Sequence, residues 1–233
     1  PSLGGSISET DNSCTPNDDK VLAGTVVNLT ANPAGGTAPF TYIWSEGSST
    51  ASINPAVSAT TTYSVTITDA NGLTTISNKT ITVISAPTAS IASVEGSCTP
   101  NDDKVLSGGS VNLTASGGVT NVRDNGLSVG ASNTVTPSVT TTYSVTATDV
   151  NGCTAVASKT ITVVSAPTAG ISAVENSGTA NDDKVVSGSP VDFTASGGVT
   201  YIWDNGLNPT ATNTVNPTAT TIYSVTATDV NGC

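Results

Sequence analysis

Apolar and polar residues alternate one by one along many short segments of this chain. In the segment YSVTATD, the apolar residues Tyr143, Val145 and Ala147 are separated by serine and threonine. Successive side chains of a strand point to opposite faces, so this pattern predicts strands with one buried and one exposed face. No stretch of ten or more residues keeps apolar positions at helical spacing without a glycine, proline or threonine cluster. We therefore expect essentially no helix.

The alternating pattern belongs to a unit that occurs three times. TTTYSVTITDANGL, TTTYSVTATDVNGC and TTIYSVTATDVNGC place Tyr63, Tyr143 and Tyr223 at intervals of 80 residues. A second motif occurs as NSCTPNDDKVLAG, GSCTPNDDKVLSG and NSGTANDDKVVSG, and Pro87 and Pro167 begin new copies. Self-similarity at a fixed interval is typical of repeat architectures. We predict three repeats, at residues 1–86, 87–166 and 167–233.

Within a repeat, the alternation predicts the strands of a small antiparallel sandwich. The strands are expected at 88–94, 110–116, 199–204, around 213–221, 143–149 and 158–165, each taken from one copy. The TDVNG segments are expected to form hairpin turns. The third copy stops at Cys233, before a counterpart of 154–165. We expect its last strand to come from a continuing polypeptide or to be donated by a partner.

Composition narrows the range of functions. The 233 residues include six Lys and Arg, seventeen Asp and Glu and no His, for a formal net charge of -11. Such an acidic chain is unsuited to nucleic acid, whose phosphates attract Lys and Arg. No apolar run approaches the roughly 18 residues that cross a bilayer. Without histidine or a nucleophile motif, we expect no enzyme. Because the chain starts at Pro1 rather than Met, we expect a processed product or a piece of a longer protein.

Three segments carry a family resemblance. GGTAPFTYIWSEG, VNPTATTIYSVTATDVNGC and LTASGGVTYIWDNG resemble the immunoglobulin-like, PKD-like repeats that occur in tandem in large secreted surface proteins of Bacteroidota, including gliding and adhesion proteins. The resemblance covers nearly the whole chain. It implies an all-β fold of three tandem immunoglobulin-like antiparallel β-sandwich domains in an end-to-end rod, the third without its last strand. It also implies export by that group's dedicated secretion system and an extracellular, stalk-like or adhesive role.

Four cysteines occupy two repeated positions. Cys14 and Cys98 follow the first strand of their repeats, whereas Cys153 and Cys233 follow the TDVNG turn. These positions lie at opposite poles of one sandwich, roughly 25 Å apart, but bridged Cα atoms lie within about 7 Å. In an end-to-end array the loop of one repeat faces the turn of the next, which favours Cys14–Cys153 and Cys98–Cys233. A Cys98–Cys153 bond and free or intermolecular thiols are the alternatives. Disulfides indicate an oxidising, extracellular setting.

Acidic residues gather in the same loops and turns. These segments hold thirteen of the seventeen carboxylates. Hard oxygen ligands without histidine suit Ca²⁺. The other interpretation is a solvated turn in which aspartates accept hydrogen bonds from backbone amides. The candidate calcium ligands are Asn17, Asp18, Asp19, Asn101, Asp102, Asp103, Asn181, Asp182 and Asp183.

Aromatic residues share one face of the TYIW strand in the first and third repeats. They are Tyr42, Trp44, Tyr201 and Trp203. One interpretation makes each tryptophan the core residue of its sandwich. The second repeat has Asn121 and Arg123 at these positions, however, and burying both without partners costs several kcal/mol. We therefore predict that the isoleucine between each pair faces the core, and that the aromatics are exposed to stack on sugars or to pack against another protomer.

Together these features predict a non-enzymatic structural or adhesive protein of the cell surface that forms a stiff stalk or filament. The expected partners are further repeats of the same polypeptide or other protomers of a surface filament. One alternative is a carbohydrate-binding module that holds surface glycans with the strand aromatics. Another is a spacer region of a larger secreted enzyme. Near-identical repeats favour a structural or spacer role over a binding module, because a specific pocket usually needs divergence between copies.

Overall fold

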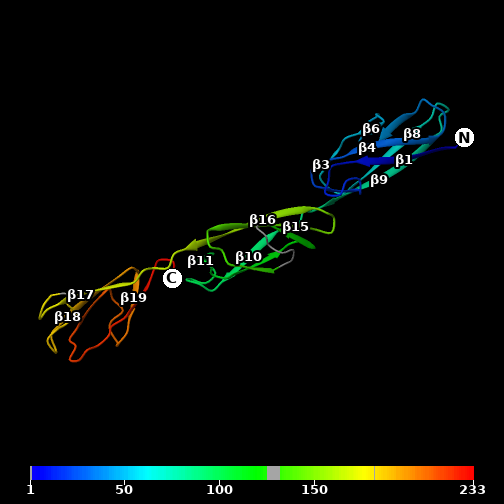
Figure 1. Ribbon diagram of the computed structural model, residues 1–233. Coiled ribbons are helices and arrows are strands. Elements are labelled where there is room, and N and C mark those ends of the chain that lie inside the picture. Colours follow the sequence, from blue (N-terminus) through cyan, green and yellow to red (C-terminus); the bar gives the residue numbers. More distant parts are fainter. Residues whose placement is uncertain (1, 125–131, 181) are drawn as a thin grey trace. The chain divides into compact units, whose positions relative to one another are not determined.

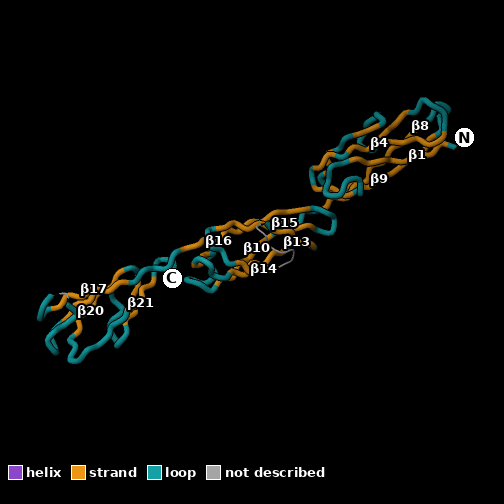
Figure 2. The backbone as a smooth tube through the Cα atoms, viewed as in Figure 1, coloured by secondary structure: helices purple, strands orange, loops and turns teal. Residues whose placement is uncertain are grey.

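The computed structural model describes residues 2–124, 132–180 and 182–233. Within these residues it contains strands, turns and loops but no helix (Figure 2). The all-β prediction is therefore confirmed, as expected for a chain rich in threonine, valine and serine, whose β-branched members pack well on a pleated surface. No helix in the described part of the chain is long and apolar enough to span a membrane.

The chain divides into two compact units. Unit 1 comprises Pro1–Ser90, Ala115–Ala131 and Ser144–Ala157, and unit 2 comprises Ile91–Thr114, Ser132–Tyr143 and Ser158–Cys233. The division passes through the second sequence repeat, which contributes segments to both units. The three repeat boundaries and the three-domain immunoglobulin-like arrangement stay predictions.

The first repeat, within unit 1, forms three sheets, whose strands are coloured blue to cyan in Figure 1. Their strand orders are β1-β4-β6, β2-β9-β8-β5 and β3-β7. The strands are β1 (Leu3–Thr10), β2 (Lys20–Leu22), β3 (Thr25–Val26), β4 (Asn28–Gly35), β5 (Thr41–Trp44), β6 (Ser52–Ile53), β7 (Ala56–Val57), β8 (Thr61–Thr68) and β9 (Thr74–Ile84). Neighbouring strands are antiparallel, except that β2 runs parallel to the end of β9.

The core of unit 1 lies between its two larger sheets. Ile7 and Leu29 come from the β1-β4-β6 sheet, whereas Trp44, Val65 and Ile81 come from the β2-β9-β8-β5 sheet, and all five are buried in one cluster. Alternation along β8 therefore places one face in the core, as the sequence predicts. The packing of two sheet faces against each other gives this repeat the layering of a β-sandwich.

Residues 90–164 supply strands to both units. They are β10 (Ser90–Glu95), β11 (Lys104–Leu106), β12 (Val111–Ser116), β13 (Thr120–Arg123), β14 (Ser132–Val135), β15 (Thr141–Thr148) and β16 (Thr154–Val164). In unit 1, β13 pairs antiparallel with β15. In unit 2, β12 pairs antiparallel with β14, and β11 pairs parallel with the end of β16. Sequence analysis missed β2 and β11 because each pairs with a strand far along the chain.

The third repeat, within unit 2, has two sheets with the orders β17-β18-β20 and β19-β21. The strands are β17 (Gly170–Glu175), β18 (Val191–Ser196), β19 (Thr200–Trp203), β20 (Thr212–Val215) and β21 (Val225–Thr228). β21 is four residues long, whereas its counterparts β8 and β15 are eight. The shortening follows from its pairing, because β21 has only β19 as a neighbour among the described strands.

Candidate functional site: the NDDK loops and the turns bonded to them

The three NDDK loops, residues 13–20, 97–104 and 177–184, are held by hydrogen bonds to their own backbone. The first aspartate of each pair accepts from the lysine amide two residues on: Lys20 N to Asp18 Oδ1 (3.0 Å), Lys104 N to Asp102 Oδ1 (3.1 Å) and Lys184 N to Asp182 Oδ1 (3.1 Å). The second aspartate has a φ near +60° in every copy. Aspartate and asparagine tolerate this left-handed region better than other side chains. The residue pattern therefore encodes the turn locally.

A glutamate from the preceding strand anchors each loop. It accepts a hydrogen bond from the second aspartate's amide: Asp19 N to Glu9 Oε2 (3.0 Å), Asp103 N to Glu95 Oε1 (2.7 Å) and Asp183 N to Glu175 Oε1 (2.7 Å). Glu9 is 8% exposed and Glu95 is 3% exposed. Sequence analysis counted these glutamates only as part of an acidic cluster. Their place at the end of a strand, eight to ten residues before the aspartate, is the signal that identifies this role.

Lysines from the long last strands neutralise two of the loops. Lys79 of β9 pairs with Asp19, and Lys159 of β16 pairs with Asp103. The pKa of Asp19 is lowered, chiefly by a hydrogen bond to Glu9 and then by Lys79. Burial opposes ionisation of Asp103, but hydrogen bonds from Lys159 and Ser93 outweigh it and lower its pKa.

The pKa of Glu9 is shifted in the opposite direction. Burial first, and then hydrogen bonds and charge repulsion from Asp19 and Asp11, raise its pKa to about 8. Oε1 of Glu9 is buried without a hydrogen-bond partner among the described residues, whereas Oδ1 of Asp19 faces Lys79 Nζ. A proton on Glu9 supplies a donor where two carboxylates would otherwise repel, since like charges that share a site favour one protonated partner. Glu9 is therefore a neutral acid at pH 7.

Each TDANG or TDVNG turn is closed by its aspartate, as the sequence predicts. Oδ1 of the aspartate accepts from the amides two and four residues on, at 2.8–2.9 Å, in all three turns: Asp69 to Asn71 and Leu73, Asp149 to Asn151 and Cys153, and Asp229 to Asn231 and Cys233. Backbone donors, that of Cys233 first, lower the pKa of Asp229. Gly72, Gly152 and Gly232 supply the positive φ that each turn requires.

Two disulfide bonds join NDDK loops to these turns. Cys14 is bonded to Cys153 within unit 1, with their Cα atoms 4.6 Å apart, and Cys98 to Cys233 within unit 2, with their Cα atoms 4.0 Å apart. All four cysteines are therefore bonded, and a Cys98–Cys153 bond is not formed. The cysteines of each pair are separated by 139 and 135 residues of sequence.

A threonine next to each loop cysteine makes a second contact between the loop and the turn, beside the disulfide. Thr15 Oγ1 donates to the Asn151 carbonyl oxygen at 2.8 Å. In the other pair, both N and Oγ1 of Thr99 donate to the Asn231 carbonyl oxygen at 3.1 Å. Sequence analysis missed both threonines. The recurrence of Cys-Thr beside Asn-Gly-Cys is the only sequence signal for this contact.

Five of the six candidate aspartates have other partners in the structure. Asn181 lies outside the described residues. Within the described ranges, no three carboxylate or cysteine side chains form a group that could hold a metal ion. The first aspartate of each pair instead accepts a hydrogen bond from a backbone amide, and Asp19 and Asp103 have lysine partners. Calcium binding by the loops stays a prediction.

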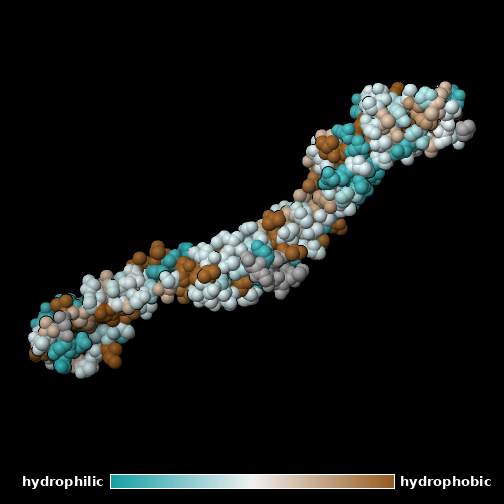
Figure 3. Space-filling model, turned by 45° about the horizontal axis from the view of Figure 1, so that its top comes forward, coloured by the Kyte–Doolittle hydropathy of each residue, from teal (hydrophilic) through white to brown (hydrophobic). Residues whose placement is uncertain are grey.

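The predicted exposure of the aromatics is wrong. Trp44 is 2% exposed and Trp203 is 6% exposed, whereas Ile43 and Ile202 are 66% and 68% exposed. Figure 3 shows that apolar residues, in brown, occur at several places on the surface. Each indole Nε1 donates to a backbone carbonyl, Thr50 O at 2.8 Å and Thr210 O at 2.9 Å. Tyr42 and Tyr201 are half-buried. Sugar stacking needs an open ring face, which neither tryptophan offers.

The error arose from the second repeat. The prediction assumes that a face carrying Asn121 and Arg123 cannot be a core face. The structure leaves Asn121 half-buried, with its Oδ1 lacking a hydrogen-bond partner. The second repeat therefore accepts a polar residue at an inward position. The position after it points outward in all three copies, as Ile43, Val122 and Ile202.

No protein-family model matches the chain, and no curated protein matches it. One solved structure, described as giving insight into host cell surface retention of a 1.5-MDa bacterial ice-binding adhesin, is 19% identical, with 99% of this chain and 84% of that chain covered and a TM-score of 0.40. A tetra-tandem repeat in the extending region of a large adhesion protein is 14% identical, with 98% and 64% covered and a TM-score of 0.22.

Proposed function

We propose that this chain is a non-enzymatic structural or adhesive segment of an extracellular surface protein, in which disulfides staple successive repeats into a stiff stalk. The observation that carries the proposal is the pairing of the cysteines. Cys14 belongs to the first predicted repeat and Cys153 to the second, and Cys98 belongs to the second and Cys233 to the third. Each bond therefore ties a loop of one repeat to a turn of the next.

The contacts around the disulfides favour a staple that resists bending. The covalent bond fixes one point, and the threonine hydrogen bond beside it fixes a second. Because the loop and the turn are attached at two points, neither can rotate freely about one of them. The loop and the turn are themselves held by glutamate and aspartate hydrogen bonds, so the staple connects two ordered segments.

The disulfides also support the proposed location. Structural disulfides persist in oxidising compartments and are rare in the cytosol, where thiols are kept reduced. The expected partners are accordingly further repeats of the same polypeptide or other protomers of a surface filament. Spacing explains why the copies are so alike, because a spacer gains length from repetition alone.

Small-angle scattering of the oxidised protein tests the stapling. The double variant Cys14→Ser/Cys153→Ser is expected to have a larger spread of molecular dimensions than the parent chain, because one connection is left with a single polypeptide link. The double variant Cys98→Ser/Cys233→Ser is expected to do the same at the other connection.

Serine at Leu73 is the matched control, because Leu73 occupies the turn position of Cys153 but makes no disulfide. Leu73→Ser should leave the scattering profile unchanged. Identical profiles for the parent and both cysteine variants would show that the disulfides do not stiffen the chain and would overturn the proposed stalk.

A further inference from the structure

In the first two repeats, a lysine of the long last strand lies against the second aspartate of the NDDK loop. Lys79 of β9 contacts Asp19 Oδ1, and Lys159 Nζ of β16 lies 2.5 Å from Asp103 Oδ2. The side chains of these lysines are only 23% and 29% exposed. An amine in contact with a carboxylate oxygen lies near the separation of about 3–3.5 Å from which it can bond to the carboxyl carbon.

Three other lysine–aspartate pairs in the described loops are more open. Each joins residues two apart in the chain, and the lysine side chains are 37–82% exposed. The distances from Nζ to Oδ2 are 3.6 Å for Lys20–Asp18, 3.3 Å for Lys104–Asp102 and 3.8 Å for Lys184–Asp182. Exposed ammonium groups stay hydrated and charged, so these are surface ion pairs. The pairs made by the strand lysines are closer and more enclosed.

A buried glutamate lies beside each of the two close pairs. Glu9 Oε2 accepts from the Asp19 amide at 3.0 Å, and the Glu9 carboxyl group is also hydrogen-bonded to the Asp19 side chain. Glu95 Oε1 accepts from the Asp103 amide at 2.7 Å. The other oxygen of each glutamate is buried without a hydrogen-bond partner among the described residues. Each close pair therefore has a buried carboxyl group beside it with one oxygen free to exchange a proton.

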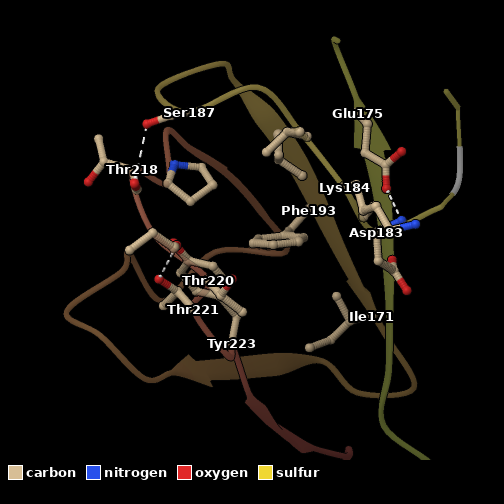
Figure 4. Close-up of a pocket in the computed structure, with 15 residues that line it drawn as sticks. Ile171, Glu175, Asp183, Lys184, Ser187, Phe193, Thr218, Thr220, Thr221 and Tyr223 are labelled. Atoms are coloured by element: carbon tan, nitrogen blue, oxygen red, sulfur yellow. Dashed lines mark hydrogen bonds between the residues drawn. The ribbon is translucent and has the colours of Figure 1, made fainter. Parts of the chain in front are cut away.

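The glutamate and the second aspartate are brought together by the strand and the loop alone. Figure 4 shows this placement in the third repeat, where Glu175 of β17 points to the Asp183 amide, and Oε1 accepts from that amide at 2.7 Å. The carboxyl groups are thus placed in advance, and the strand lysine is the group that completes the site in the first two repeats.

The protonation of the glutamate suits it to proton transfer. Burial first, and then Asp19 and Asp11, raise the pKa of Glu9 to about 8, so Glu9 carries a proton at pH 7. A neutral acid against a carboxyl group can donate its proton to a departing oxygen, and the resulting carboxylate can take a proton from an attacking nitrogen.

We propose that each close pair condenses to an amide, which cross-links the last strand to the NDDK loop of the same repeat. The bonds join Lys79 to Asp19 and Lys159 to Asp103. The lysine first passes one proton to the aspartate carboxylate, which gives an amine and a carboxylic acid. Nζ then attacks Cγ and the N–C bond forms. The glutamate relays a proton from the nitrogen to the departing hydroxyl group, one C–O bond breaks, and one water molecule leaves.

In the second repeat, a hydroxyl group adds to this chemistry. Ser93 Oγ donates to Asp103 Oδ1, whereas Lys159 lies at the other oxygen, Oδ2. If Oδ2 departs as water, Oδ1 remains as the amide oxygen, and negative charge develops on it during the attack. A hydroxyl group already aimed at that oxygen stabilises the charge. Ser93 therefore acts on the reacting group and is a catalytic residue of this site.

The cross-link forms a closed covalent ring with the disulfide. From Lys79 the chain runs on to Cys153, the disulfide leads to Cys14, and the loop returns to Asp19. A pulling force on β9 then passes to the loop through covalent bonds as well as through strand pairing. The inference does not depend on the proposed stalk function, because each amide lies within one repeat.

Intact-mass spectrometry of the folded, reduced parent chain tests the proposal. The mass should be lower than that of the sequence by two water molecules, and peptide mapping should locate one cross-link in each of the first two repeats. Lys79→Arg and Lys159→Arg should each restore one water molecule. Arginine keeps the positive charge and the ion pair, but its guanidinium stays protonated and is not a nucleophile.

Glutamine variants separate the proton relay from the anchoring of the loop. Glu95→Gln keeps an oxygen that accepts from the Asp103 amide but cannot relay a proton, so the second amide should form at least about a hundredfold more slowly. Glu9→Gln should do the same at the first site. Lys104→Arg, in an open ion pair, is the matched control and should keep both cross-links. Equal rates for Glu95→Gln and the parent would contradict the proton relay.

Two results would overturn the proposal as a whole. One is a parent chain of full sequence mass whose circular dichroism shows intact sheets. The other is loss of the same two water molecules from Lys79→Arg/Lys159→Arg, which would show dehydration elsewhere in the chain. In Lys79→Arg the first pair stays an ion pair, so this variant is the background in which the titration of Glu9 is followed.

Discussion

The first and third repeats have closely similar sequences, but the same site is closed in one and open in the other. In the first repeat β9 lies along β8, and Leu29 and Tyr63 are buried. In the third repeat, Phe193 and Tyr223 at the same positions are half-buried and line a groove. Alternation decides which side chains face inward, but burial also requires the strand that covers them.

The NDDK loops of these two repeats show the same division. The local turn is present in both, because the Glu–Asp and Asp–Lys hydrogen bonds come from the loop and its preceding strand. Strand β2 exists only where β9 supplies a parallel neighbour, and the side chain of Lys184 is 82% exposed while that of Lys20 is 44% exposed. Local residues therefore form the turn. The residues that follow it form a strand only where a distant strand pairs with them.

The largest expected difference is between Leu29→Ala and Phe193→Ala. Leu29 is fully buried, so its truncation should lower the free energy of unfolding of the first repeat by about 2–5 kcal/mol. Phe193 is already partly exposed, so its truncation should cost the third repeat less than about 2 kcal/mol. Urea unfolding followed by Trp44 fluorescence in a Trp203→Phe background, and by Trp203 fluorescence in a Trp44→Phe background, measures each repeat. Equal costs would contradict the open groove.

The next effect comes from the disulfide that the first loop has and the third lacks. Cys14→Ser/Cys153→Ser should lower the free energy of unfolding of unit 1 by about 2–4 kcal/mol, because cross-linking restricts the unfolded chain. Thr15→Val leaves the disulfide and removes only the neighbouring hydrogen bond, for a loss of about 1 kcal/mol. Thr179→Val, in the loop with Gly178 in place of cysteine, is the matched control and should change nothing. A cysteine variant as stable as the parent would show that the bond is not formed.

A pH dependence should distinguish the first loop. The pKa of Glu9 is about 8 in the folded chain and 4.5 as a free side chain. The folded state therefore holds this proton more tightly, and its contribution to stability is complete below pH 4.5 and is lost as the pH rises through 8. Glu9→Gln keeps an acceptor oxygen and removes the titration, so it should stabilise unit 1 at pH 8.

Urea titrations of Trp44 fluorescence across this pH window measure the effect. The parent chain should lose stability with rising pH more steeply than the Glu9→Gln variant, and Glu175→Gln in the third repeat controls for the loss of a carboxylate. Parallel pH profiles for the parent and Glu9→Gln would show that Glu9 is already ionised in the folded chain.

The smallest expected effect separates two equivalent glycines. Gly72 and Gly152 have φ values of +80° and +77°, so alanine strains both turns alike. A Cβ at Gly152 would lie 2.8 Å from Thr15 Oγ1, whereas a Cβ at Gly72 would meet nothing within 4 Å. Gly152→Ala should therefore destabilise unit 1 by about 1 kcal/mol more than Gly72→Ala in urea unfolding. Equal losses would show that the threonine does not press against this turn.

Sequence alone predicted the features that depend on neighbouring residues. The alternation gave the strand that begins near Tyr143, and the Asp-x-Asn-Gly pattern gave turns that the structure closes with aspartate side chains. The short strand β11 could not be predicted, because it pairs with the end of β16, 58 residues further along the chain. The predicted direction of Trp44 is wrong, because a polar residue at the same face of another copy, Asn121, does not prevent burial of the tryptophan. Hydrogen bonds between distant segments, such as Thr15 to Asn151, leave no local signal.

The central claim is that loops are bonded to the turns of the following repeat, and non-reducing peptide mapping by mass spectrometry tests it most directly. Proteolysis of the alkylated, unreduced protein should yield peptides that join Cys14 to Cys153 and Cys98 to Cys233, with no alkylated cysteine. A peptide that joins Cys98 to Cys153, or four alkylated thiols, would contradict the account.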